Sequence, residues 1–238
     1  MNLAAYIDHT LLKGEATVEQ VQTVVAEARR LGCASVCVNG AFVGPVSRAL
    51  AGTPVKTCAV AGFPLGAGKA SIKAIEATAA VKDGAQEVDF VAFLPHLLKR
   101  DLAAAKLEFM EIVRAARGVS PAVTVKVILE TALLMAGVAE AEAEERIAIA
   151  CQAARESGCD FIKTSTGFHP TGGASEAAVR LLKKHAGGLS VKAAGGIRTA
   201  ADALKMIAAG ADRLGCSATV AIVEGAGGRG PGALGYGV

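Results

Sequence analysis

Residues 157–167 read Ser-Gly-Cys-Asp-Phe-Ile-Lys-Thr-Ser-Thr-Gly. They contain the end of one predicted helix and the whole of the predicted strand that follows it. A glycine that can close a helix comes near the start, and a short apolar run with one lysine follows it. The same junction recurs as Leu31-Gly-Cys33, Asp83-Gly-Ala85 and Ala209-Gly-Ala211. This recurrence indicates a repeated unit in which a helix ends and a buried strand begins.

Apolar, β-branched runs alternate with helical stretches along most of the chain. The predicted strands are residues 6–12, 35–39, 55–61, 87–93, 123–130, 160–166, 190–194 and 213–217. Helical spacing of apolar residues predicts helices over residues 17–31, 69–82, 102–117, 139–157, 175–185 and 200–209. Such alternation is typical of parallel βα units, in an open doubly wound sheet or a closed barrel. Its evenness, with polar residues at many strand ends, favours an α/β fold of one (β/α)8 TIM barrel.

The length and composition suit a single domain. The chain has 238 residues, of which 52% are hydrophobic and only 4% aromatic, as in a barrel interior built from branched aliphatic side chains. We expect residues 1–224 to form the catalytic barrel domain and the glycine-rich residues 225–238 to form a flexible tail. The formal net charge is +3 and no basic run is present, so no nucleic-acid partner is expected.

The six cysteines bear on the cellular compartment. They form no Cys-x-x-Cys pair and no cluster of the kind found in small secreted scaffolds, so we interpret them as reduced thiols of a cytoplasmic protein. No signal peptide or membrane-spanning run is recognisable, which predicts a soluble protein with no membrane partner. No set of His, Asp and Glu has metal-ligand spacing, so we expect no metal and no other cofactor.

Two lysines carry the chemistry, Lys163 and Lys192, the second within Ser190-Val-Lys-Ala-Ala-Gly-Gly-Ile-Arg198. Both lie in apolar runs that are predicted to be neighbouring buried strands, although lysine is rarely buried without a partner. Two adjacent ammonium groups repel one another, and we expect this repulsion to keep one of the amines neutral near pH 7. A neutral lysine attacks carbonyl carbon, so the pattern predicts Schiff-base chemistry.

Carboxylates occur on other predicted strands. Asp89, in Gln86-Glu-Val-Asp-Phe90, alternates with apolar neighbours and therefore shares a strand face with Glu87. Facing inward, Asp89 can relay protons with Lys192; the alternative is a salt bridge that merely neutralises the lysines. Asp8 and Lys126 also lie on or near the C-terminal strand ends, where barrel enzymes place reactive groups.

Glycine-rich segments follow the last strands and predict a phosphate site. Gly195-Gly196 comes after the seventh predicted strand and Gly215-Cys-Ser217 ends the eighth, while Gly167 follows the Lys163 strand. Loops after strands seven and eight of such barrels often hold a phosphate on backbone N–H groups. Glycine allows the close approach that such loops need.

Eight segments, taken in order, resemble the deoxyribose-phosphate aldolase family, whose members are class I aldolases on a (β/α)8 barrel. The segments are residues 7–13 (IDHTLLK), 36–39 (VCVN), 60–66 (VAGFPLG), 87–89 (EVD), 126–131 (KVILET), 161–168 (FIKTSTGF), 191–198 (VKAAGGIR) and 213–217 (RLGCS). Each segment is short, but their order and spacing together are specific to the family.

The resemblance implies reversible cleavage of 2-deoxy-D-ribose 5-phosphate to D-glyceraldehyde 3-phosphate and acetaldehyde, without a cofactor. It implies that Lys163 forms the Schiff base and that Asp89 and Lys192 act as proton donor and acceptor. Further residues implied at the substrate are Asp8, Thr10, Cys37, Lys126, Gly167, Gly195, Gly196, Ile197, Arg198, Gly215, Ser217 and, near the C-terminus, Tyr236. Phe168 and Ala218 depart from the family pattern, where some members have lysine and many have serine, and both changes are expected to weaken phosphate affinity.

Three alternatives stay open at this point. The first is another Schiff-base aldolase that takes a longer keto substrate. The second is a barrel isomerase that uses the phosphate loops with an acid/base pair and no covalent step. The third is a sugar-phosphate binder without catalysis. For the aldolase that the resemblance implies, the expected partners are small molecules, namely sugar phosphates and aldehydes, and the chain is expected to form a homodimer or homotetramer.

Overall fold

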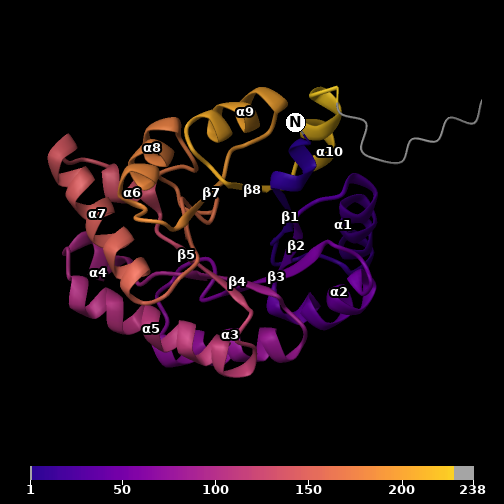
Figure 1. Ribbon diagram of the computed structural model, residues 1–238, viewed down its shortest axis with the longest axis horizontal. Helices are drawn as coiled ribbons and strands as arrows, with labels where there is room; N and C mark the ends of the chain where they lie inside the picture. The colour runs from indigo at the N-terminus through magenta and orange to yellow at the C-terminus, as the bar shows by residue number, and fades with distance from the viewer. Residues whose placement is uncertain (1, 228–238) are drawn as a thin grey trace, which may run out of the picture.

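The repeated helix-then-strand unit closes on itself into a barrel of parallel strands (Figure 1). The computed structural model describes residues 2–227. Within them the strands are β1 Ile7–Leu11, β2 Ser35–Val38, β3 Lys56–Ala61, β4 Glu87–Val91, β5 Thr124–Ile128, β6 Phe161–Lys163, β7 Ser190–Ala194 and β8 Arg213–Cys216. They follow one another in sequence order around the barrel, and β8 pairs with β1. The predicted (β/α)8 class is confirmed, and the open sheet is excluded.

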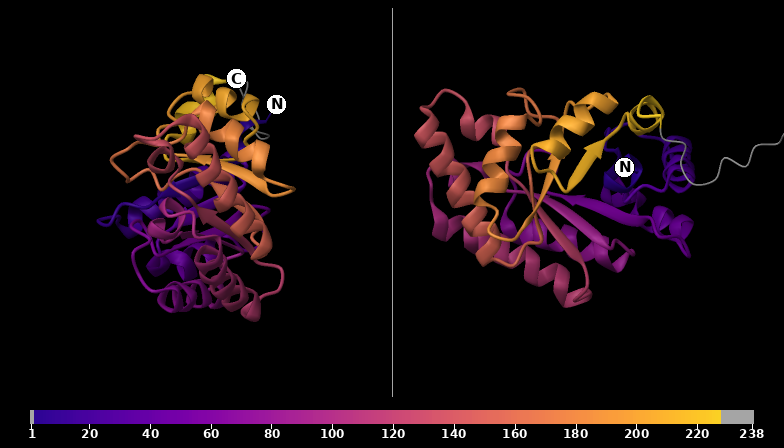
Figure 2. Two further views of the ribbon diagram at one scale, coloured as in Figure 1. Left: turned by 90° about the vertical axis from the view of Figure 1, so that its left-hand side faces the viewer. Right: turned by 45° about the horizontal axis from the view of Figure 1, so that its top comes forward.

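Helices surround the strands on every side (Figures 1 and 2). They are α1 Val18–Leu31, α2 Val43–Leu50, α3 Ala70–Lys82, α4 Leu94–Leu98, α5 Leu102–Val119, α6 Thr131–Met135, α7 Glu140–Glu156, α8 Glu176–His185, α9 Ala200–Ala208 and α10 Thr219–Gly225, with 3-10 turns η1 Leu3–Tyr6 and η2 Gly40–Phe42. The turn η1 lies beside α10, so the two ends of the described chain meet at one side of the barrel. None of the helices in this part of the chain is long and apolar enough to cross a membrane.

The side chains of each strand alternate between the barrel interior and the layer of helices, as the period of two requires. In β4, Val88 and Phe90 belong to the apolar cluster between strands and helices. The ring of Phe90 contacts Phe109 of α5 edge to face, with 5.4 Å between centroids. Glu87 and Asp89 therefore point inward, as the sequence predicts.

The structure differs from the sequence prediction mainly at the C-terminal ends of strands. The predicted strand over residues 160–166 is confined to β6, since the hydroxyls of Thr164 and Ser165 both donate to the carbonyl of Ala194 and take the chain out of the ladder. The short helices α2, α4, α6 and α10 were not expected. Most of the predicted tail, including Tyr236, lies outside the described residues.

Candidate active site

Charged side chains occupy the interior of the barrel, because inward positions on six strands carry them. They are Asp8 of β1, Glu87 and Asp89 of β4, Lys126 of β5, Lys163 of β6, Lys192 of β7 and Arg213 of β8. Asp89 lies at the centre of this cluster. Its Oδ1 is 2.7 Å from Nζ of Lys126, and its Oδ2 is 2.9 Å from Nζ of Lys163 and 2.7 Å from Nζ of Lys192.

These contacts determine the charge state of the carboxylates. Burial alone would raise the pKa of Asp89, but Lys126, Lys163 and Lys192 outweigh it and hold the pKa well below its usual range. Burial likewise opposes ionisation of Asp8, whose pKa is nevertheless lowered by Lys192, Lys126 and Arg213. Both carboxylates are therefore ionised at neutral pH and can accept protons or hydrogen bonds.

The expectation that one amine of the lysine pair is neutral stays a prediction, but Lys192 is not that amine. Burial lowers the pKa of Lys192, but Asp8 and Asp89 raise it by more, and the net shift is upward. Nζ of Lys192 is 2.5 Å from Oδ2 of Asp8 and 2.7 Å from Oδ2 of Asp89. Lys192 is thus protonated at neutral pH, because the carboxylates of Asp8 and Asp89 surround its amine. The sequence could not place these carboxylates in contact with it.

Lys126 lies deeper in the barrel than the other two lysines. Its register partners are Asp89 on β4 and Phe161 on β6, whereas Lys163 pairs two residues further along β5. Its amine is 2.6 Å from Oε2 of Glu87, and the net effect of burial and of its anionic neighbours is a pKa well above the usual range. Lys126 therefore stabilises Asp89 from below and does not line the cavity described next.

A cavity of about 290 Å³ opens at the C-terminal ends of β1, β6, β7 and β8. Its lining residues are Thr10, Leu11, Leu12, Lys13, Lys163, Thr166, Gly167, Phe168, Ala194, Gly195, Gly196, Ile197, Arg198, Gly215, Cys216 and Ser217. Eight of the twelve residues predicted at the substrate are among them. Of the predicted catalytic residues, Lys163 lines the cavity. Asp89 contacts its amine from within the barrel, and Lys192 binds the same oxygen of Asp89.

The glycines of the cavity have backbone conformations in which any other residue would be strained. Gly167, Gly195 and Gly196 have φ angles of 82°, 92° and 82°. A Cβ on Gly195 would lie 2.7 Å from Oγ of Ser165 and 2.9 Å from Cα of Gly173. The loops after β6 and β7 thus pack backbone against backbone at the cavity wall.

Cys37 and Cys58 are register partners on β2 and β3, and both are fully buried. The hydrogen bond from the Cys58 thiol lowers the pKa of Cys37, although burial opposes this. Sγ of Cys58 also lies 3.3 Å from Oδ1 of Asp89. Cys37 is therefore next to the charged cluster, but it is not part of the cavity lining.

Two groups in the barrel have ligand atoms close enough together to hold a metal ion, Cys37 with Cys58 and Asp89, and Asp8 with Cys58 and Glu87. Their carboxylates, however, already bind the ammonium groups of Lys126 and Lys192. A metal ion would have to displace these cations, so the donor set fits a lysine cluster better than a metal.

Sequence reasoning missed two residues of the site. Lys13 follows β1 and places an exposed cation at the cavity, opposite in sign to a phosphate. Glu130 is buried in a left-handed conformation with φ of 52°, and its Oε1 accepts a 2.7 Å hydrogen bond from the N–H of Thr166. Both lie inside motifs that carried the resemblance, and the signal for Glu130 is a carboxylate directly after an apolar strand.

Residues 2–226 match the model of the DeoC/LacD family aldolases. The chain belongs to this aldolase family. The match covers the whole barrel, including all strands that supply the charged cluster and the cavity.

Similarity to individual aldolases supports this assignment. The chain is 46% identical over 197 residues to the deoxyribose-phosphate aldolase of Streptococcus pneumoniae serotype 19F, strain G54, covering 82% of this chain and 84% of the relative. It is 47% identical over 197 residues to the deoxyribose-phosphate aldolase of Caldanaerobacter subterraneus subsp. tengcongensis, covering 82% and 81%. A solved deoxyribose phosphate aldolase from Aeropyrum pernix, described as a unique tetrameric structure, superposes with a TM-score of 0.83 at 34% identity, covering 93% and 89%.

Proposed function

We propose that this DeoC/LacD family aldolase reversibly cleaves 2-deoxy-D-ribose 5-phosphate to D-glyceraldehyde 3-phosphate and acetaldehyde, with Lys163 as the Schiff-base lysine. The observation that carries the proposal is the position of Lys163, which lines a glycine-walled cavity while its amine lies 2.9 Å from Oδ2 of Asp89. The names of the two curated relatives support the choice of substrate.

The reaction begins when the neutral amine of Lys163 attacks the aldehyde carbon C1 of the open-chain sugar. Loss of water from the carbinolamine gives an iminium ion, which acts as an electron sink. Acetaldehyde contains two carbons, so the bond that breaks joins C2 to C3. Its electron pair moves toward the iminium and forms an enamine, while the C3 hydroxyl loses its proton and becomes the aldehyde of glyceraldehyde 3-phosphate. Protonation of the enamine at C2 and hydrolysis then release acetaldehyde.

Asp89 and Lys192 supply the proton transfers in this proposal. Lys192 is held as a cation and can donate a proton to the departing water, whereas ionised Asp89 can accept one. Asp8 maintains the charge of Lys192, and Thr10 donates to the carbonyl of Asp8 at 2.8 Å while lining the cavity. A proton donor and a proton acceptor thus lie next to each other at the Lys163 amine.

The far end of the cavity is the proposed phosphate site. Backbone N–H groups around Gly167, Gly195, Gly196, Ile197, Gly215 and Ser217, together with the side chains of Arg198 and Lys13, are available to an anion there. Binding energy from the phosphate, which is remote from C1, orients the reacting carbon over Lys163.

The decisive experiment is reduction with sodium borohydride in the presence of acetaldehyde, followed by intact mass and peptide mapping of wild type and Lys163→Ala. We expect an ethyl adduct on Lys163 that the variant lacks. An adduct on no lysine would refute the Schiff-base mechanism. A panel of phosphorylated and unphosphorylated sugars then identifies the substrate, and release of glyceraldehyde 3-phosphate from deoxyribose 5-phosphate is the expected result.

We also propose that residues 1–224 form one catalytic domain and that the protein is a homodimer or homotetramer in the cytoplasm. The tetrameric description of the Aeropyrum pernix enzyme supports an oligomer. The six cysteines are all free thiols, which supports a reducing compartment. Light scattering that detects only monomer would contradict the oligomeric state.

A further inference from the structure

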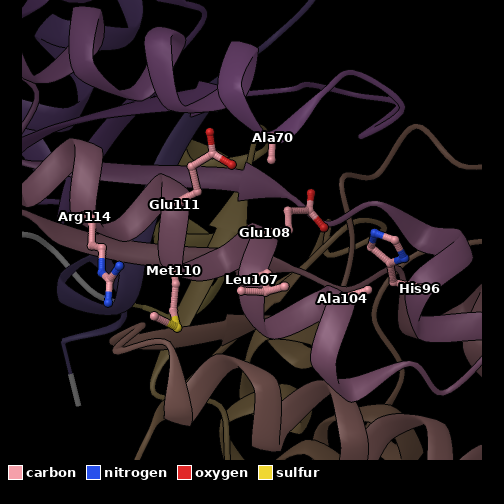
Figure 3. A pocket seen from close by; sticks show the side chains of 8 residues that line it. All are labelled: Ala70, His96, Ala104, Leu107, Glu108, Met110, Glu111 and Arg114. Atoms are coloured by element: carbon pink, nitrogen blue, oxygen red, sulfur yellow. The ribbon is translucent and has the colours of Figure 1, made fainter.

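A buried ion pair lies outside the barrel, between α3 and α5, and takes no part in the mechanism above. Lys73 of α3 is fully buried, and its Nζ is 2.6 Å from Oε1 of Glu108 of α5, which is only 5% exposed. Figure 3 shows Glu108 at a surface groove that Ala70 of α3 and His96 of α4 also line. A fully buried lysine is uncommon even when it is paired, so its contacts call for an explanation.

Both members of the pair bind the backbone at the C-terminal end of β4. Nζ of Lys73 donates to the carbonyl of Val91 at 2.8 Å. The two carboxylate oxygens of Glu108 accept from the N–H of Phe93 at 3.0 and 3.1 Å. The β3–β4 register ends at residue 90, whereas β4 stays paired with β5 to residue 91. The ion pair thus holds β4 on the side where it runs beyond β3. Asp89 lies two residues before Val91 on this strand.

The aliphatic part of Lys73 also supports the loop after β3. Gly62 has a φ of 63°, and a Cβ there would lie 2.9 Å from Cδ of Lys73. The N–H of Gly62 donates to Glu76, another residue of α3, at 2.5 Å. The following residue, Phe63, contacts the ring of Phe168 at the cavity, with 5.2 Å between centroids. The pair therefore touches two of the segments that border the site.

We propose that Lys73 and Glu108 are positioning residues which hold the end of β4 so that Asp89 meets Lys163 and Lys192 at once. This inference rests on the proposed function of those three residues. Stability alone is a poor explanation for the pair, because a buried ion pair can often be replaced by apolar side chains without loss of stability. Placement of a carboxylate that must serve two amines, by contrast, tolerates little displacement.

The pair is expected to affect one half of the site only. The phosphate cavity is built from the ends of β1, β6, β7 and β8, none of which Lys73 or Glu108 contacts through a hydrogen bond. Loss of the pair should therefore slow the formation of the Lys163 imine and leave phosphate affinity unchanged. A merely structural role predicts no such separation.

The test uses the double variant Lys73→Met/Glu108→Gln. It removes both charges together, so that neither is left buried alone, and the glutamine keeps an acceptor for the N–H of Phe93. The rate constant of imine formation with acetaldehyde is measured by quenching with borohydride, at a temperature at which circular dichroism shows both proteins to be fully folded. We expect this rate constant to fall about tenfold or more. The dissociation constant of inorganic phosphate, from a ³¹P NMR titration, is expected to stay within about twofold of wild type.

A matched control is available on the same helix. Lys106 of α5 and Glu156 of α7 form an exposed ion pair at 2.7 Å, and Lys106→Met/Glu156→Gln should leave both constants unchanged. A rate constant within twofold of wild type in the Lys73/Glu108 variant would overturn the proposal, as would an equal loss of phosphate affinity. If that variant does not fold, Lys73→Gln/Glu108→Gln, which also keeps a donor for the carbonyl of Val91, is read in the same way. A wild-type enzyme that forms no imine would refute the proposed function, and the positioning role with it.

Discussion

Lys163 and Lys192 are direct register partners on β6 and β7, and their amines bind the same oxygen, Oδ2 of Asp89, at 2.9 and 2.7 Å. The spacing of the two amines is thus fixed by the barrel ladder and not by a flexible loop. One carboxylate oxygen thus binds the amines of two neighbouring strands. Asp89 therefore positions both amines, although it does not line the cavity itself.

Replacement of Asp89 by asparagine tests this linkage. The variant keeps the size of the side chain but leaves three buried lysines without their shared counterion. We expect the turnover number to fall about 10²- to 10⁴-fold and the free energy of unfolding in urea to fall by about 3–5 kcal/mol. The exposed Asp83→Asn serves as control. Turnover close to that of wild type would mean that Asp89 only neutralises the lysines.

The barrel and the inward side of its strands could be predicted from sequence, because both depend on local periodicity. The alternation in Gln86-Glu-Val-Asp-Phe90 is sufficient to place Glu87 and Asp89 on one face, and the structure agrees. Contacts across the barrel could not be predicted in this way. The upward pKa shift of Lys192 requires Asp8 of β1 and Asp89 of β4, which periodicity within one strand cannot bring together.

The segments after each strand were the least predictable. Glu130 holds Thr166 from a left-handed backbone conformation that no propensity rule assigns to glutamate. Lys73 belongs to a helix whose apolar periodicity gives no sign of a buried cation, yet it is buried against Gly62 just after β3. In both cases the deciding contact is made by a residue that is distant in sequence, so that only the folded chain reveals it.

The stability contributed by Asp8 should depend on pH in a defined direction. Burial alone would raise the folded-state pKa of Asp8. The cations Lys192, Lys126 and Arg213 outweigh burial, so the net shift is downward. A carboxylate with a depressed pKa stabilises the fold fully above its unfolded pKa of about 3.9 and loses that contribution as the pH falls further. We expect Asp8→Asn to be destabilising by about 3–5 kcal/mol at neutral pH. Urea unfolding of both proteins from pH 7 down to about pH 3 should show this difference shrinking below about pH 4. A difference that stays constant would contradict the assignment.

Gly195 should be intolerant of even one added methyl group. In Gly195→Ala the Cβ would contact Ser165 and Gly173 at 2.7 and 2.9 Å, and the φ of 92° is strained for alanine. Relieving these contacts moves the backbone N–H groups of the cavity, so we expect KM for deoxyribose 5-phosphate to rise about tenfold or more. Unphosphorylated deoxyribose should be cleaved as before. Gly14→Ala, where a Cβ meets nothing within 4 Å, is the matched control, and equal losses on both sugars would argue against a phosphate role for this loop.

Lys13 should contribute to phosphate binding through charge alone. It is exposed at the cavity and lies beside backbone N–H groups, so it attracts an anion without a rigid geometry. For Lys13→Met we expect KM for deoxyribose 5-phosphate to rise about threefold to tenfold at low salt, with the turnover number and the borohydride adduct on Lys163 unchanged. The difference from wild type should become smaller as salt is added, because screening weakens exposed charges. Lys99→Met removes an equally exposed cation that does not line the cavity, and KM is expected to stay at the wild-type value. If both substitutions raise KM alike, the effect comes from the overall charge of the protein and Lys13 has no specific place at the phosphate.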